Sequence, residues 1–487
     1  MDNSQLKKSV FTGMIWKLAE RVGAQAVTLL ISIVLARLLT PDDYSIVGIV
    51  TVFFAFCNVF VVGGFNTALI QKKDADVKDY SSVLIISTLI AAVLYTALFF
   101  CAPWIAQLYE KPLLVPIFRV MGLTLIIDAV KAVLYAYVSN QLQFKKFFFS
   151  TLCGTLASAA VGIVMAYRGF GPWALVAQKM VSSIADTVVL IFTSKLRVEL
   201  KVSFQRIKSL FSYGWKIFVA SIISTVYEQI NPLIIGLRFT GADLSFYSKG
   251  HSFPLALNTA LDGALTSVLF PAMSKVQDDK KAVLEYTRRF MQTASYVIFP
   301  VMIGFLAVSD SFVRVLLTEK WMGASIYIKI FCVTFMFNII QNGNLQTIRA
   351  IGRSDIILKL EIVKKTLYFV VILIAVIFAR DPVVLAVATV VNTAIATVVN
   401  TIPNGKLIGY KLGAQFMDIL PNLLIASIMG VLVYLINFAP INPFIMLLAQ
   451  CVAGVGVYLL LSILTSNKSF RYLLQTLQQF LGKRRKS

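Results

Sequence analysis

Hydrophobic and polar positions alternate along this chain in long blocks. Fourteen apolar stretches, most of them about 20 residues or longer, are separated by short polar gaps. A helix needs roughly 20 apolar residues to cross the hydrocarbon core of a bilayer. The pattern therefore predicts an all-α polytopic membrane protein with fourteen transmembrane helices. The predicted spans are 10–38, 43–64, 80–102, 113–138, 148–167, 171–194, 210–237, 245–272, 286–309, 323–348, 355–379, 382–403, 414–437 and 442–465.

Positive charge is divided unevenly between the polar gaps. Most lysines and arginines lie in alternate gaps, for example at Lys72 and Lys73 and at Lys145 and Lys146, and in the tail 483–486. Such residues stay on the cytoplasmic side of a membrane. An even number of spans independently places both termini on one side. We therefore expect a multi-pass protein of the cell inner (plasma) membrane, with a retained first span and both termini cytoplasmic.

The composition agrees with a membrane protein and argues against catalysis. Of 487 residues, 58% are hydrophobic and only 14% are charged, and the net charge is +22. In a soluble chain this charge would suggest a nucleic-acid partner, but here it lies in loops and a tail that face anionic lipid. The five cysteines show no CxxC spacing, His251 is the single histidine, and the short external gaps hold no catalytic motif. We predict no enzyme, no metal, no cofactor and no nucleic-acid partner.

Two regions of the chain share an order of residues. Trp16-Lys17 is followed by Thr40 and Asp43, and Trp215-Lys216 is followed by Thr240 and Asp243. Chance similarity between two apolar segments is the alternative, but the order favours two homologous six-span lobes related by a pseudo-two-fold axis along the membrane normal. The predicted parts are an N-terminal lobe (1–194), a cytoplasmic amphipathic linker that forms a helix on the membrane surface (195–209), a C-terminal lobe (210–404), an additional helix pair (405–466) and a basic cytoplasmic tail (467–487).

Polar residues inside the predicted spans mark a candidate central cavity. A charge at the centre of a bilayer costs roughly 2.5–3.5 kcal/mol on insertion scales, so it should face water or a partner. The candidates for contact with a cargo are Lys17, Arg21, Gln25, Lys216, Glu228, Asn231, Lys249, His251 and Asn258. An excess of cations suits a phosphate or pyrophosphate, and amide side chains suit sugar hydroxyls. The alternatives are contacts between helices and snorkelling of Lys17 and Lys216 to lipid headgroups.

Three carboxylates are candidates for coupling transport to an ion gradient. Glu20, Glu228 and Asp262 lie within predicted spans and could bind H⁺ or Na⁺. Glu20 could instead pair with a cation one turn away. The last two spans are almost wholly apolar, with Gly430, Gly454 and Gly456 permitting close helix approach. They could shelter a lipid tail or simply widen the scaffold.

Several short motifs resemble those of one known family. The motifs are RLLTPDDY (37–44), ALIQKK (68–73), GFGPWALV (169–176), YSK (247–249), LFPA (269–272), EKW (319–321) and AIGRSD (350–355). In this order they resemble the Wzx-type polysaccharide flippases of the multidrug/oligosaccharidyl-lipid/polysaccharide exporter superfamily. Ser45 departs from the pattern, because the family usually has Gly there.

The resemblance implies a fourteen-span, two-lobed fold and a transport function. The implied cargo is an undecaprenyl-pyrophosphate-linked oligosaccharide, moved by alternating access from the cytoplasmic to the periplasmic leaflet for O-antigen, capsule or exopolysaccharide synthesis. A polysaccharide polymerase and a chain-length regulator are the expected partners. The alternatives are an ion-coupled drug exporter of the MATE type, a lipid II flippase, and a membrane glycosyltransferase, which the short external gaps argue against.

Overall fold

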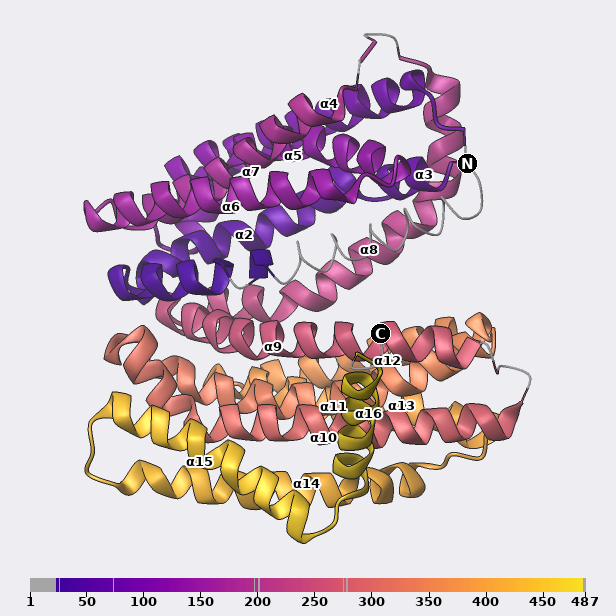
Figure 1. Cartoon of the computed structure of the whole chain (residues 1–487). Helices are drawn as coiled ribbons and strands as arrows, with labels where there is room; N and C mark the ends of the chain where they lie inside the picture. The colour runs from indigo at the N-terminus through magenta and orange to yellow at the C-terminus, as the bar shows by residue number, and fades with distance from the viewer. Residues whose placement is uncertain are drawn as a thin grey trace. The chain divides into compact units, whose positions relative to one another are not determined.

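In the computed structural model, every regular element in the described part of the chain is a helix (Figure 1). The described residues are 23–484 apart from 26, 73, 197, 200, 201, 275, 277 and 278. The elements are a helical run Gly23–Leu38, α2 Pro41–Val62, α3 Phe65–Gln71, α4 Val77–Leu108, α5 Leu114–Asn140, α6 Phe144–Tyr167, α7 Pro172–Ser194, α8 Phe204–Arg238, α9 Gly241–Ser274, α10 Lys280–Phe312, η1 Val313–Leu317, η2 Glu319–Trp321, α11 Gly323–Ala350, α12 Ser354–Phe378, α13 Val383–Leu407, α14 Leu412–Leu435, η3 Ile436–Phe438, α15 Pro443–Leu464 and α16 Lys468–Arg484.

Ten of these helices are long and apolar enough to cross a membrane. They are α2, α4, α6, α7, α8 from Gly214 onward, α10 continued to Leu317, α11, α13, α14 continued to Phe438, and α15. The prediction of an all-α, multi-pass membrane protein is therefore confirmed. Each predicted span also overlaps one long helix or the run Gly23–Leu38. That all fourteen cross the membrane stays a prediction.

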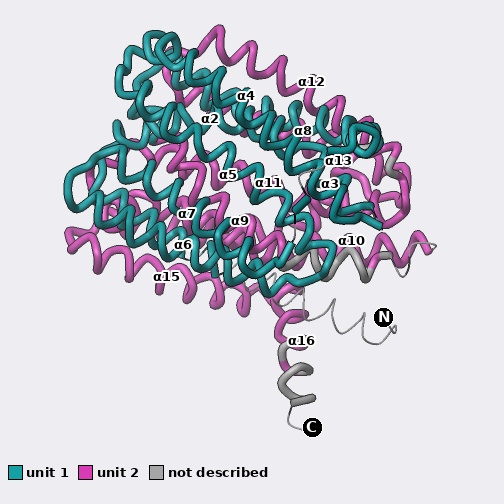
Figure 2. Tube along the Cα trace, turned by 90° about the horizontal axis from the view of Figure 1, so that it is seen from above, with its two compact units in different colours: residues 1–245 teal, residues 246–487 magenta. Residues whose placement is uncertain are grey.

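The chain forms two compact units, residues 1–245 and 246–487 (Figure 2). The boundary falls five residues into α9, because the start of this helix packs against α2. The Ser245 hydroxyl donates to the Pro41 carbonyl, and Leu244 lies against Gly48. The predicted lobes, with their boundary at 195–209, stay a prediction.

The repeated Thr–Asp pairs fold into the same helix cap twice. At the start of α2, the Asp43 N–H donates to the Thr40 hydroxyl (3.2 Å), and Thr40 N–H returns a bond to the Asp43 carboxylate (2.8 Å). At the start of α9, Asp243 and Thr240 form the corresponding bonds at 3.2 and 3.1 Å. Each pair satisfies backbone donors that a helix N-terminus leaves without partners. The sequence repeat therefore has a structural counterpart, whereas the pseudo-two-fold arrangement of whole lobes stays a prediction.

Two glycines let α8 cross the short helix α3 with backbones almost in contact. A Cβ added to Gly214 would lie 2.7 Å from the Gly64 carbonyl oxygen, and one added to Gly64 would lie 2.6 Å from the Gly214 oxygen. Gly64 also has a φ of +86°, which other residues adopt only with strain. This crossing lies beside a buried cluster that includes Leu69, Tyr80 and Leu210.

The linker was predicted to be helical over 195–209, and the structure is helical there only from Phe204 onward. The described residues between 195 and 203 are not helical, and α8 begins at Phe204. The backbone N–H groups of Glu199 and Ser203 donate to the hydroxyls of Ser81 (2.9 Å) and Ser82 (3.1 Å) at the start of α4. These hydroxyls accept backbone donors that a helix would have satisfied internally, so this segment, called the strap below, is fixed to the start of α4 through Glu199 and Ser203.

Charged residues hold the same strap at its end. Arg206, in the first turn of α8, pairs with Asp76 and with Asp79 (3.1 Å), and Lys72 also pairs with Asp79 (2.6 Å). Asp79 is fully buried, so it needs these cations. The hydrogen bond from Arg206 lowers the pKa of Asp76 to about 2.

In the second unit, a buried amide network joins α11, α13 and α14. Asn344 and Gln415 exchange two hydrogen bonds (2.8 and 2.9 Å), and Asn404 donates to the Asn344 side chain (2.6 Å). All three side chains are buried. Amides that hydrogen-bond one another in this way act as contacts between helices, which was the alternative interpretation of polar residues in the predicted spans.

Glycines of the last two spans differ in their packing. A Cβ at Gly430 would lie 2.4 Å from Ile303, and one at Gly454 would make an ordinary 3.4 Å contact. A Cβ at Gly456 would meet nothing within 4 Å. Close helix approach is therefore confirmed at Gly430, and the prediction is wrong for Gly456.

Candidate functional site

One face of α8 lines a hollow of about 500 Å³. The lining residues are Lys216, Ile217, Ala220, Ser221, Ser224 and Thr225. They recur every fourth position in two adjacent rows, which places them on one side of the helix. Lys216, predicted from the sequence, is exposed at one end of this face. The described lining thus offers one ammonium group and three hydroxyls, a set that suits an anionic, hydroxyl-rich ligand.

Several other residues predicted from the sequence are only partly accounted for in the described part of the chain. Lys17, Glu20 and Arg21 lie outside the described residues. Gln25, in the helical run Gly23–Leu38, is exposed, as is Glu228 on α8. Asn231, one turn further along α8, is buried. That these residues contact a cargo stays a prediction.

On α9, two predicted residues each contact aromatic rings of the second unit. Lys249 is only 7% exposed, and its Nζ lies 5.8 Å from the centre of the Trp321 ring. The His251 ring meets Phe331 edge-on at 4.6 Å and lies 5.7 Å from Phe335. An ammonium over an aromatic face is attracted by the ring quadrupole, so these contacts hold Lys249 within the unit.

Further along α9, two predicted residues occupy partly or fully buried positions. Asn258 is 7% exposed, and its Oδ1 makes no hydrogen bond within the described part of the chain. A buried amide oxygen without a hydrogen-bond donor destabilises the fold, so a donor group of a polar ligand would bind favourably at this position. Asp262 follows one turn later and is half-buried.

A partly buried ion pair in the first unit was missed from the sequence. Lys131 and Asp128 lie one turn apart in the middle of α5, with Nζ 2.7 Å from Oδ1. Ser183 of α7 donates to the same carboxylate and accepts from Lys131 (3.1 Å). Two mid-span charges three residues apart were visible in the sequence and could have indicated the pair, because neither is tolerable alone in a membrane.

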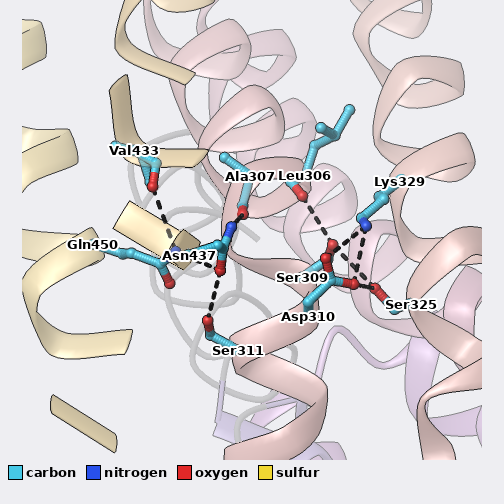
Figure 3. A network of polar contacts seen from close by, with 10 residues as sticks. All are labelled: Leu306, Ala307, Ser309, Asp310, Ser311, Ser325, Lys329, Val433, Asn437 and Gln450. Atoms are coloured by element: carbon cyan, nitrogen blue, oxygen red, sulfur yellow. Dashed lines mark hydrogen bonds and ion pairs between the residues drawn. The ribbon is translucent and has the colours of Figure 1, made fainter. Parts of the chain in front are cut away.

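A similar pair lies in the second unit (Figure 3). Lys329 of α11 contacts both carboxylate oxygens of Asp310 at the end of α10 (2.9 and 2.7 Å), and Ser325 donates to the same group. Beside it, Asn437 accepts from Ser311 (3.1 Å) and from Gln450 (3.0 Å). The pairing joins two consecutive α-helices across 19 residues, which exceeds the three- or four-residue spacing of neighbours on one helix, so spacing alone gave no sign of it.

The motifs that carry the family resemblance meet in space. In the first unit, Leu39 of one motif and Leu175 of another share a buried cluster, and a Cβ at Gly171 would lie 3.1 Å from the Asp43 carboxylate. In the second unit, Lys249 lies beside the fully buried Trp321. Motif residues that are far apart in the chain therefore pack against one another within each unit.

A profile of the family described as "Polysaccharide biosynthesis protein" matches residues 34–326, which is more than half of the chain. The chain belongs to this family. The resemblance to Wzx-type polysaccharide flippases, drawn from motifs within the same region, is thereby confirmed.

Curated relatives of this polysaccharide biosynthesis protein have related names. It is 23% identical to the succinoglycan biosynthesis transport protein ExoT of Rhizobium meliloti over 64% of each chain. It is 23% identical to the lipopolysaccharide biosynthesis protein WzxC of Escherichia coli over 76% of this chain and 75% of WzxC. It is 22% identical to the teichuronic acid biosynthesis protein TuaB of Bacillus subtilis over 62% of this chain. The matches span slightly less than two thirds of ExoT and TuaB, 64% and 63%.

Solved structures share the fold at low identity. The lipid II flippase MurJ, in an inward closed conformation, matches 95% of this chain and all of its own, with a TM-score of 0.76 and 16% identity. An inward-facing multidrug resistance MATE family transporter matches 80% of this chain and 98% of its own, with a TM-score of 0.58 and 15% identity. This member of the polysaccharide biosynthesis family thus has the fold of membrane transporters.

Proposed function

We propose that this protein is a flippase that moves undecaprenyl-pyrophosphate-linked oligosaccharide units from the cytoplasmic to the periplasmic leaflet of the inner membrane. The units would feed synthesis of O-antigen, capsule or exopolysaccharide. The observation that carries the proposal is the hollow on α8, where Lys216 and three hydroxyls line a membrane helix of a polysaccharide biosynthesis protein. A cation and hydroxyls are what a pyrophosphate-linked sugar requires.

The proposed mechanism is alternating access. Fourteen spans would form two six-helix lobes and an additional pair, with both termini in the cytoplasm. Rocking of the lobes would carry the polar headgroup across while the prenyl tail stays in lipid. Lys17, Arg21 and Gln25 of the first span, with Lys249, His251 and Asn258 of α9, are the further proposed cargo contacts.

The driving force in this proposal is an ion gradient. Glu20, Glu228 and Asp262 are the proposed binding groups for H⁺ or Na⁺. Glu228 is exposed on the same helix as Lys216, which supports access of an ion to it. Polysaccharide polymerase and a chain-length regulator are the proposed partners on the far side of the membrane.

The test compares two lysines of α8 in a strain that depends on this chain for surface polysaccharide. Lys216→Ala removes the ammonium from the hollow and is expected to reduce polymer export at least tenfold, whereas Lys216→Arg keeps the charge and most of the export. Lys208→Ala is the matched control, because Lys208 is exposed on α8 but does not line the hollow. Unchanged export in Lys216→Ala, with normal membrane levels, would contradict the role of the hollow.

A lipid II flippase is the second candidate, since its cargo is also a prenyl pyrophosphate. The same strain separates the two proposals. Loss of surface polysaccharide with intact growth supports the polysaccharide cargo, and loss of peptidoglycan synthesis supports lipid II.

A further inference from the structure

The tail helix α16 is fixed to the second unit by a buried asparagine. Asn467 is 7% exposed, and its Oδ1 accepts from the backbone N–H groups of Ser469 (2.9 Å) and Phe470 (3.1 Å), which caps the helix. Its Nδ2 donates to Asn422 of α14 (2.8 Å). Ser469 also donates to the Gln292 carbonyl of α10 (3.1 Å). These bonds define where α16 starts and hold its first turn against α10 (Figure 1).

A polar cavity of about 360 Å³ lies where α16 crosses α10. Its lining residues are Arg289, Gln292, Thr293, Lys468, Ser469, Tyr472 and Gln475. Two of them are cations from different helices, and none of the residues named for the cavity is acidic. Ligand pockets range from roughly 300 to 1,000 Å³, so the cavity has room for a small headgroup.

The two cations differ in how far they are already engaged. Arg289 stacks on the Tyr472 ring at 5.3 Å and pairs with Glu285 (2.7 Å). Both partners of that pair are largely exposed, 49% and 71%, so the pair is weak and leaves the guanidinium able to bind an anion. Lys468 is exposed and makes no ion pair within the described residues. The cavity therefore carries uncompensated positive charge.

We propose that this cavity binds the phosphate of an anionic lipid headgroup at the cytoplasmic surface of the membrane. Only Thr465, Ser466 and Asn467 separate the end of the membrane helix α15 from α16, so α16 cannot leave the membrane surface. The same short helix carries Lys468 and Leu474, which is 44% exposed. Apolar and basic residues together on a short surface helix are typical of binding to anionic lipid.

The experiment measures lipid binding to the full-length protein by native mass spectrometry in detergent. After delipidation, the protein is titrated with phosphatidylglycerol or with phosphatidylcholine of the same acyl chains. We expect one saturable site that prefers phosphatidylglycerol. Lys468→Ala should weaken that site about tenfold, which is about 1.4 kcal/mol, and Lys468→Arg should restore it. Addition of Arg289→Gln should weaken it further.

Arg471→Ala is the matched control. Arg471 is exposed on the same helix but does not line the cavity, so its loss should change the affinity less than twofold. An equal effect of Arg471→Ala would show diffuse surface charge and overturn the site. Competition by inorganic phosphate or pyrophosphate at concentrations comparable to those of the lipid would show a free-anion site and overturn the lipid assignment. Because binding is measured without transport, the proposal stands or falls separately from the flippase function.

Discussion

Replacement of Gly214 by alanine probes the contact between α8 and α3 directly. The new Cβ would lie 2.7 Å from the carbonyl oxygen of Gly64 and 2.8 Å from its carbon, inside the distance at which real Cβ atoms are found. The obstacle is backbone, so no side-chain rotation relieves the clash. Overpacking of this kind costs about 1–3 kcal/mol. The better helix propensity of alanine returns up to about 1 kcal/mol. We expect a net loss of about 1–2 kcal/mol.

Gly456→Ala is the control with the opposite expected sign. Nothing lies within 4 Å of its added Cβ, so only the gain in helix propensity, up to about 1 kcal/mol, remains. The assay is thermal unfolding of the full-length protein in detergent, followed by tryptophan fluorescence. At about 2 °C per kcal/mol for a unit of this size, Gly214→Ala should unfold about 2–4 °C earlier and Gly456→Ala slightly later than the parent. Equal midpoints for the two variants would refute the close backbone crossing.

Three further predictions concern charges and caps. Asp128→Asn removes the partner carboxylate of Lys131. Because both side chains keep some exposure (15% and 25%), we expect the free energy of unfolding in denaturant to fall by about 1–3 kcal/mol and to recover largely in Asp128→Asn/Lys131→Met. Additive losses in the double variant would contradict the pairing. Thr40→Ala and Thr240→Ala should each lower the free energy of unfolding by about 1 kcal/mol in the same assay, because the two caps have the same hydrogen bonds. A loss at only one site would argue that the two caps are not equivalent. The Asp76–Arg206 pair should stabilise the strap above about pH 4 and release it as the pH falls towards the Asp76 pKa of about 2, which hydrogen exchange would detect as faster exchange of the Glu199 amide. Asp76→Asn should remove this acid-induced step, and an unchanged step in that variant would count against the pair.

Most of the helical framework was predictable from the sequence, because one physical requirement dominates it. A membrane helix must satisfy its own backbone bonds and remain apolar, so blocks of hydrophobic residues report its position directly. The two caps at Thr40 and Thr240 were noted only as a repeat and not predicted as caps, although their signal is local, because the partner lies only three residues away. Both kinds of feature depend on near neighbours in the chain.

Features that depend on distant neighbours were not predictable. The described residues of the strap before α8 are not helical, and Ser81 and Ser82, more than a hundred residues earlier, accept the backbone donors of Glu199 and Ser203. Lys249 was expected to face a hydrated cavity from its charge alone. Trp321, seventy-two residues further along the chain, lies beside it, and no spacing rule encodes that contact. A glycine in the sequence likewise permits close helix approach but does not reveal whether a second helix lies there. Gly430 has a close neighbour, Ile303, whereas Gly456 has none within 4 Å in the described part of the chain.

The central claim is that the protein moves a lipid-linked oligosaccharide across the membrane. The most direct measurement uses the purified full-length protein in liposomes loaded with undecaprenyl-pyrophosphate-linked glycan, with a membrane-impermeant glycosidase added outside. The account predicts that the protein makes the inner-leaflet glycan accessible to the enzyme, and that Lys216→Ala does so much more slowly than Lys208→Ala. If glycan on the inner leaflet stayed protected at the level of protein-free liposomes, the flippase function would be contradicted.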